Sequence, residues 1–286
     1  MKRLLLGLLF LAAGAGAKES PFEGTWSFQL PDYRPVWLKV SGETEVELLW
    51  SVGSAKPTKD VWINHGVLAF QRKFRWKPYG NEADLREVIA PVYCTVSKKG
   101  DMLMTVRPTS GDLIVLTGKK MPPPPKKPVL DQVRFGPPIS LIERNSLTGW
   151  KLFNSNKKNG WWVEDGILIN ETPKKDFSGY GEFGNLVTER HFGDFRLSIE
   201  YNVPPAGNSG IYLRGAYEAQ VVDKDSRMQG IIGPGAIFGR IAPSENAGKA
   251  GGEWNRYVLT LVDQHITVEL NGKTVIDNQL IEGCTG

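Results

Sequence analysis

Residues 217–223, YEAQVVD, have the aromatic and β-branched content of a strand and carry two side chains suited to a polyhydroxylated ligand. Glu218 and Gln220 are two positions apart, so both point to one face of an extended strand, while the apolar residues of the run point to the other. A carboxylate beside an amide offers hydrogen-bond acceptors and donors together. The spacing therefore predicts a polar face that lines a sugar site.

The run SGIYLRG at residues 209–215 predicts a neighbouring strand, with Asn208 directly before it. Tyr212 and Arg214 would share one face of this strand. An arginine fork beside a carboxylate and an amide suits a polyhydroxylated ligand. Two interpretations stay open at this point, because the same residues would also form a buried, satisfied salt bridge.

Several familiar chemistries find no support in the sequence. Glu218 and Asp223 are five positions apart and would face opposite sides of a strand, whereas a retaining glycosidase needs two carboxyl groups about 5–5.5 Å apart. His65, His191 and His265 lack the HxH or HExxH spacing of a zinc site. No nucleotide-binding motif occurs, so no cofactor is predicted; a divalent cation such as calcium, held by Glu218, Asp223 or backbone oxygens, remains open.

The N-terminus has the pattern of a secretory signal peptide. Lys2 and Arg3 precede an apolar run at residues 4–13, and small residues lead to a cleavage site after Ala17. The run is shorter than the roughly 20 residues that span a bilayer, so we expect no membrane span. The sequence therefore predicts a secreted or periplasmic protein.

The remaining residues divide at a proline-rich stretch. Consecutive prolines in MPPPPKKP favour an extended conformation, so we place a linker at residues 121–136. Short strand-like runs before it predict a smaller antiparallel β domain at residues 18–120. Longer alternating runs after it predict a β-sandwich at residues 137–286. No segment has a sustained 3.6-residue period, so helices should be scarce and the fold class all-β.

Charge and cysteine content narrow the partners. The 35 Lys and Arg against 31 Asp and Glu give a net charge of +4, of which the signal peptide carries two, so nucleic acid is not an implied partner. Cys94 and Cys284 lie on opposite sides of the linker, and we expect two free thiols.

Tryptophan is abundant, with nine residues, and each is expected in a core by default. Trp254 is the exception that we single out, because it follows the glycine-rich loop at residues 239–253 and its indole could stack on a pyranose ring. The glycine-rich segment 223–240 also suits a loop that borders a site.

Five motifs occur in an order that resembles the 3-keto-disaccharide hydrolase family: LTGW (147–150), WWVEDGIL (161–168), LVTERHFGDFRLSIEY (186–201), GNSGIYLRGAYEAQVVD (207–223) and GEWNRY (252–257). The resemblance covers about residues 137–286. It implies a concanavalin A-like sandwich, or jelly roll, in which a concave sheet binds sugar. Members usually continue past Thr285 and Gly286 into further strands, so the resemblance also implies an incomplete domain.

The same resemblance implies a reaction on a 3-keto-glycoside, in which loss of the C2 proton leads to elimination of the C1 substituent. It assigns Glu218 as the base and Arg214 as the stabiliser of the developing oxyanion. The expected substrate-binding residues are Asn208, Tyr212, Gln220, Asp223 and Trp254. A noncatalytic carbohydrate-binding module and a structural or adhesive cell-envelope protein remain as alternatives.

Overall fold

The computed structural model describes residues 20–31, 34–42, 44–50, 56–76, 86–106, 113–172 and 182–283. The expected signal peptide and Cys284 lie outside these residues. The described chain is built from strands joined by turns, with two short 3₁₀ helices at Leu130–Gln132 and Gly230–Ile232. The all-β prediction is confirmed.

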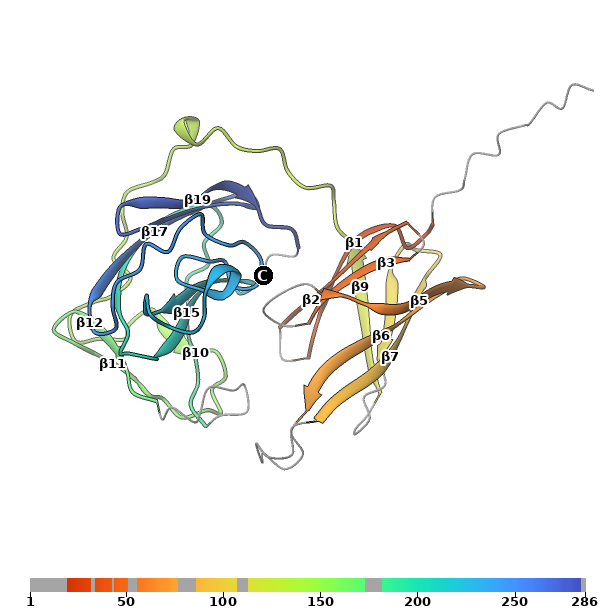
Figure 1. Ribbon diagram of the computed structural model, residues 1–286, viewed down its shortest axis with the longest axis horizontal. Helices are drawn as coiled ribbons and strands as arrows, with labels where there is room; N and C mark the ends of the chain where they lie inside the picture. The colour runs from red at the N-terminus through yellow and green to blue at the C-terminus, as the bar shows by residue number, and fades with distance from the viewer. Residues whose placement is uncertain are drawn as a thin grey trace, which may run out of the picture. The chain divides into compact units, whose positions relative to one another are not determined.

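The N-terminal strands form one nine-stranded sheet in the order β4-β3-β2-β1-β9-β8-β7-β6-β5 (Figure 1). Its strands from β5 to β9 pair antiparallel, each with its neighbour in sequence. The bounds are β1 Gly24–Gln29, β2 Pro35–Ser41, β3 Glu45–Trp50, β4 Lys56–Pro57, β5 Lys59–Asn64, β6 Val67–Trp76, β7 Arg86–Val96, β8 Met102–Val106 and β9 Ile114–Lys120.

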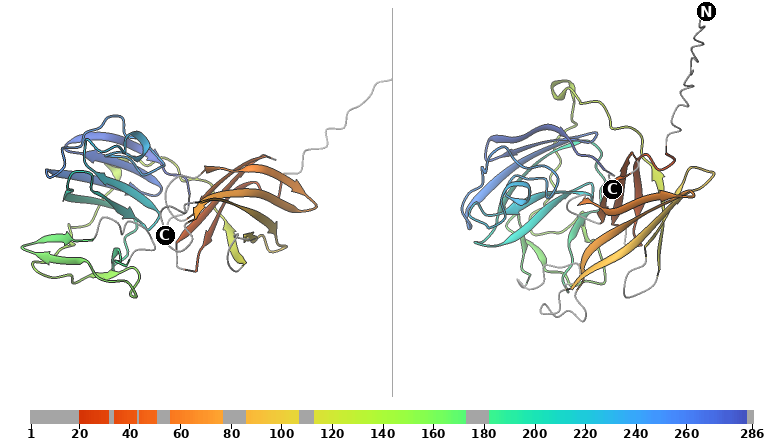
Figure 2. Two further views of the ribbon diagram at one scale, coloured as in Figure 1. Left: turned by 60° about the horizontal axis from the view of Figure 1, so that its bottom comes forward. Right: turned by 45° about the vertical axis from the view of Figure 1, so that its right-hand side comes forward.

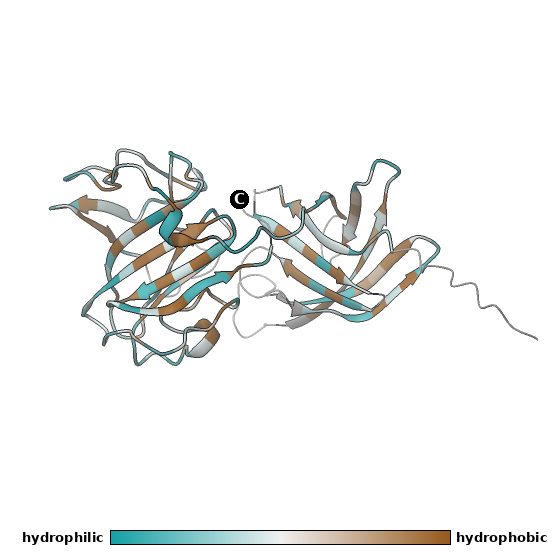
Figure 3. Ribbon diagram, turned by 90° about the horizontal axis from the view of Figure 1, so that it is seen from above, coloured by the Kyte–Doolittle hydropathy of each residue, from teal (hydrophilic) through white to brown (hydrophobic). Residues whose placement is uncertain are grey.

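Alternation along these strands builds the core of the sheet. On β8, Met102 and Met104 are buried while Leu103 between them is exposed, as the two-residue period requires. Cys94 on β7 is a buried free thiol that forms no disulfide, and burial raises its pKa to about 12. Figure 3 shows this alternation as apolar and polar bands that cross the strands.

The C-terminal strands form a four-stranded sheet, β14-β17-β18-β19, and three two-stranded pairs, β10-β13, β11-β12 and β15-β16. The bounds are β10 Trp150–Leu152, β11 Trp161–Glu164, β12 Ile167–Asn170, β13 Leu186–Thr188, β14 Phe195–Asn202, β15 Asn208–Leu213, β16 Tyr217–Val222, β17 Trp254–Val262, β18 His265–Leu270 and β19 Lys273–Leu280.

One hydrophobic core joins the β15-β16 hairpin to the four-stranded sheet. Leu213, Tyr217 and Ala219 of the hairpin pack in the same cluster as Leu259 and Val268 of the sheet. Figure 2 shows the hairpin as a layer beneath the blue strands β17 to β19. This packing is that of a β-sandwich, preceded in the chain by antiparallel β structure, as the sequence predicts.

The expected meander is confirmed. β17 and β18 pair antiparallel through a turn at Asp263, whose φ is 50°. Asn271 and Gly272 join β18 to β19 with φ values of 52° and 81°, which a two-residue hairpin turn of the mirror-image type requires.

By its contacts the chain divides into two compact units. The first contains residues 39–47 and 57–120 among others, and the second contains 26–38, 48–56 and everything from 121 onward. Residues 121–129 have no regular secondary structure, and the Asn278 side-chain amide donates a hydrogen bond to the Pro128 carbonyl, 2.9 Å. The domain boundaries drawn from the sequence stay predictions.

No helix in the described ranges is long and apolar enough to cross a membrane.

Candidate functional site

The β15-β16 hairpin presents one polar face and one apolar face. Its register pairs Asn208 with Val222, Gly210 with Gln220, and Tyr212 with Glu218, so the side chains of these pairs lie on the same face. The residues of the other face enter the sandwich core. The expectation that Glu218 and Gln220 share a face away from the core is confirmed.

Hydrogen bonds hold the backbone of this face from two sides. The edge of β16 that is free of β15 receives a short segment, in which the Phe238 amide donates to the Glu218 carbonyl at 2.8 Å. The Gln220 amide donates to the Ala236 carbonyl at 3.0 Å, and the Tyr257 hydroxyl donates to the Gln220 carbonyl at 2.6 Å. Glu218 and Gln220 are therefore placed by a rigid strand rather than by a loop.

Glu218 has the electrostatics of a proton-transfer group. Burial raises its pKa from 4.5 to about 7, and a hydrogen bond with Tyr212 opposes part of this rise. The pKa of Tyr212 is also raised, first by burial and then by the charge of Glu218, so the phenol stays neutral. A carboxyl group that titrates near neutral pH next to a neutral hydroxyl can act as a general base beside a hydrogen-bond donor.

Gly210 makes room for the Glu218 carboxyl group. A Cβ atom at this position would lie 2.1 Å from Glu218 Oε1 and 2.8 Å from its Cδ. The backbone of Gly210 does not have a positive φ, so its conformation does not require glycine. The carboxyl group therefore lies directly against the neighbouring strand because this residue has no side chain.

Gln220 lies deeper in the same face, with 1% of its surface exposed. Its Nε2 donates to Asn208 Oδ1 at 3.3 Å and contacts Met228 Sδ at 3.7 Å. Its Oε1 is buried and has no hydrogen-bond partner among the described residues. An unpaired buried acceptor costs about 1–3 kcal/mol, and a hydroxyl donor from a ligand would satisfy it.

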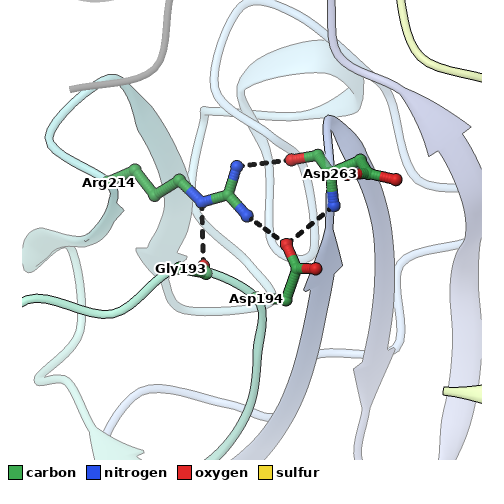
Figure 4. A network of polar contacts seen from close by, with 4 residues as sticks. All are labelled: Gly193, Asp194, Arg214 and Asp263. Carbon is green, nitrogen blue, oxygen red and sulfur yellow. Dashed lines mark hydrogen bonds and ion pairs between the residues drawn. The ribbon is translucent and has the colours of Figure 1, made fainter.

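Arg214 does not join this face, contrary to the sequence-based expectation. The strand ends at Leu213, and Arg214 enters the turn with a φ of 49°. Its guanidinium group donates to the carbonyl of Gly193 at 3.0 Å, to the carbonyl of Asp263, and to Asp194 Oδ1 at 2.7 Å (Figure 4). These acceptors take three of its five N–H donors and hold the group at the hairpin turn, so Arg214 ties this turn to the turns beside β14 and β17.

Asp223 is also occupied by the fold. Its Oδ2 accepts a hydrogen bond from the Ala206 amide at 2.9 Å, and its Oδ1 accepts one from the Asp225 amide at 3.0 Å. The side chain is 4% exposed. The expected substrate contact is therefore replaced by a structural role, in which the carboxylate joins two turns at the end of β16.

Trp254 is exposed, but the register does not bring it to the polar face of the hairpin. It begins β17 opposite Asn202 of β14, and the alternation along β17 sends Tyr257 and Leu259 into the core and Trp254 away from it. The sandwich core thus lies between Trp254 and the face of Glu218. The register thus places Trp254 on a different face from Glu218, and the expectation that Trp254 stacks on a sugar stays a prediction.

The residue after Trp254 has a role that the sequence analysis missed. Asn255 is 2% exposed, and its Oδ1 accepts hydrogen bonds from the Lys249 amide at 2.9 Å and from Asn271 Nδ2 at 2.8 Å. The motifs GEWN and LNG therefore fix the loop that precedes β17. A polar residue at a core-facing position of an alternating strand is the signal that could have identified it.

A hollow in the C-terminal unit lies elsewhere. It has a volume of about 510 Å³ and is lined by Trp161, Trp162, Phe183 and four neighbouring residues, and none of the Glu218 face takes part. Within the described ranges, no three His, Cys, Asp or Glu side chains gather as a metal site would require. Binding of a divalent cation therefore stays a possibility raised by the sequence alone.

Fold and site together define a class of protein: a β-sandwich with a polar sheet face, which is a common arrangement among carbohydrate-active domains. The chain belongs to the 3-keto-alpha-glucoside-1,2-lyase-like domain family, whose model matches residues 137–286. The family expected from the five motifs is confirmed.

Individual relatives are distant. A 3-keto-disaccharide hydrolase from Bacteroides thetaiotaomicron is 23% identical over 169 residues, which are 50% of this chain and 58% of that protein. The chain therefore spans little more than half the length of this relative.

Two crystal structures of candidate glycosyl hydrolases from Parabacteroides distasonis are similar at 28% and 22% identity, with TM-scores of 0.42 and 0.40. They cover 52% and 48% of this chain and 67% and 69% of their own.

Proposed function

We propose that the C-terminal domain cleaves 3-keto-glycosides, with Glu218 as the general base. The observation that carries this proposal is the half-buried Glu218 carboxyl group, whose pKa is raised to about 7 and which lies over Gly210 beside the neutral Tyr212 hydroxyl. Membership of the 3-keto-alpha-glucoside-1,2-lyase-like family and the similarity to a named 3-keto-disaccharide hydrolase support the substrate class. The expected signal peptide supports action outside the cytoplasm.

The reaction begins at the carbon next to the ketone. A C3 ketone acidifies the C2 proton, so the Glu218 carboxylate can take this proton. The electron pair of the C–H bond then forms a C2–C3 double bond, and the negative charge of the resulting enolate lies on the C3 oxygen. The enolate then forms a C1–C2 double bond and expels the C1 substituent, which leaves with its bonding electrons and is protonated. Addition of water across the double bond completes a net hydrolysis.

Tyr212 takes the role that the sequence analysis gave to Arg214. Its hydroxyl is a neutral donor on the same face as Glu218, and a donor near a developing oxyanion lowers the barrier to enolate formation. Asn208 is the exposed amide of the same face and can contact sugar hydroxyls, while its Oδ1 accepts a hydrogen bond from the buried Gln220 amide. No step uses a cofactor.

The test compares a 3-keto-glucoside with its unoxidised parent, incubated with the full chain with and without EDTA. Release of the C1 substituent is measured together with incorporation of deuterium from D₂O at C2, which reports proton abstraction directly. Glu218→Gln should abolish both readouts on the keto substrate. Glu200→Gln, at an exposed position on β14, is the matched control and should retain both.

The outcomes separate the alternatives. Release from the keto substrate alone, with exchange at C2 that depends on Glu218, supports ketone-enabled elimination. Equal cleavage of the parent glucoside would refute the role of the ketone. Saccharide binding without exchange or release in a cooperatively folded sample would instead identify a noncatalytic carbohydrate-binding module.

A further inference from the structure

The outer face of the N-terminal sheet carries a row of side chains that crosses five strands. The register pairs Trp62 with Ala69, Ala69 with Tyr93, Tyr93 with Thr105, and Thr105 with Val115. Because directly paired residues of antiparallel strands point to the same face, the five side chains lie in one line from β5 to β9.

This row is open to solvent although most of it is apolar. Trp62 is 47% exposed, Tyr93 44% and Val115 51%. Ala69, between the two aromatic residues, is only 3% exposed, so larger neighbouring side chains must cover it. Residues at the alternate positions of these strands, such as Phe70, Cys94 and Met104, fill the core on the opposite face. The row itself is therefore not needed for packing. Exposed apolar surface of this kind marks an interaction site.

The spacing of the aromatic residues fits a linear ligand. Adjacent strands are about 4.8 Å apart, so Trp62 and Tyr93, with one strand between them, are about 10 Å apart. Val115 lies two further strands along the same line, again about 10 Å away. This interval is close to the length of two pyranose rings in an extended glycan, in which alternate rings present an apolar face in the same direction.

The chemistry of the row favours a neutral ligand. None of its five members carries a formal charge, so a charged partner would find no complementary group within the row. The Thr105 hydroxyl between Tyr93 and Val115 can donate or accept a hydrogen bond, as a sugar hydroxyl requires. Indole and phenol rings pack on the apolar faces of sugars and leave the sugar hydroxyls at the edge in water.

We propose that Trp62 and Tyr93 form a platform that binds an extended, neutral polysaccharide, with the glycan running across the strands of the N-terminal sheet. The platform shares no residue with the face of Glu218 and requires no ketone in its ligand. It would hold the protein on a polymer whose oligosaccharides other enzymes release and oxidise.

The experiment measures retention of the full chain on insoluble cellulose, chitin and xylan at low and high salt. The wild type should be retained on at least one polymer, with no loss at high salt because the row is uncharged. Trp62→Ala and Tyr93→Ala should each weaken retention about tenfold, and the double variant should abolish it. Phe135→Ala, which removes a ring that is 41% exposed outside the sheet, is the matched control and should change nothing.

Three results would overturn the proposal. The first two are no retention of the wild type on any of the polymers and retention that survives the double variant. The third is a wild-type dimer that becomes a monomer in the variants on sedimentation, since a second copy of the chain would then cover the row. Trp62→Phe and Tyr93→Phe keep an aromatic ring and should keep retention, which guards against a misfolded alanine variant. Cleavage of a soluble 3-keto-glucoside should be equal in all these variants, so failure of the platform and failure of the proposed reaction are distinguishable.

Discussion

Gly210→Ala changes the position of the Glu218 carboxyl group and little else. The added Cβ would lie 2.1 Å from Glu218 Oε1, whereas ordinary contact begins at 3.4 Å, so the carboxyl group must move by about 1.3 Å. Glu218 Cγ and Cδ would also lie too close, at 2.7 and 2.8 Å, so the side chain must move from Cγ outward. Because a misplacement of about 1 Å in a reacting group can cost about 100-fold in rate, we expect kcat on a 3-keto-glucoside to fall by about this factor.

The same substitution should have only a small effect on stability. Gly210 has no positive φ, so alanine can adopt its backbone conformation, and the gain of about 0.4–1 kcal/mol from a restricted unfolded chain offsets part of the cost of displacing the Glu218 side chain. Thermal unfolding with steady-state kinetics therefore separates the two effects. Gly193→Ala is the matched control, because a Cβ there meets nothing within 4 Å and its φ is not positive.

A double-mutant cycle makes the reasoning refutable. If Gly210→Ala acts only through Glu218, adding it to Glu218→Gln should cause no further loss of rate, since coupled changes are not additive. Full kcat in Gly210→Ala would show that the position of this carboxyl group does not matter for turnover. An additive loss in the double variant would show that Gly210 contributes by another route.

Three further predictions follow from the same contacts. The base must be ionised, so kcat/KM should rise with pH up to about 7 and level off above it, and a flat profile between pH 5 and 8 would remove Glu218 from this role. Because the folded-state pKa lies above the unfolded value of 4.5, the folded protein binds the proton more tightly, and stability should fall as pH rises from about 4.5 to 7. The full effect would be about 3 kcal/mol, which partial exposure reduces to about 1–2 kcal/mol, so Glu218→Gln should be more stable than wild type at pH 8 and equal to it at pH 4 in urea titrations. Arg214→Ala should lower the free energy of unfolding by about 2 kcal/mol because Asp194 and two carbonyl groups lose their donor, yet leave kcat of the folded fraction unchanged; a selective loss of kcat would restore Arg214 to the reaction.

The two-residue period of a strand allowed part of the site to be predicted. Glu218 and Gln220 share the polar face because pleated backbones alternate, and that rule needs no knowledge of the rest of the chain. The same rule failed at Arg214, because it holds only as far as the strand continues. The strand ends one residue earlier, and the acceptors that fix Arg214 come from residues 193–194 and 263, which local spacing does not reveal.

Trp254 shows a second limit of the sequence. Its place in a motif and its distance from a glycine-rich loop say nothing about which face of the sandwich it joins. That face depends on which residues of β17 enter the core. Tyr257 enters it, and Asn255, one two-residue period earlier, points the same way, so Trp254 points to the other face. The alternation of buried Asn255 and exposed Trp254 is therefore decided by long-range packing rather than by the motif itself.

Hydrogen bonding separates the residues that serve the fold from those that are free to act on a ligand. Arg214 and Asp223 have the charges expected of a site, but backbone groups and Asp194 occupy both of them. Gln220 keeps a buried acceptor without a donor, and Glu218 keeps a carboxyl group whose ionisation is made costly by burial. A structural role would select against both conditions, since each lowers the stability of the folded state. Gln220 and Glu218 carry these two conditions side by side on one polar face, and a ligand bound there gives a single physical reason for both.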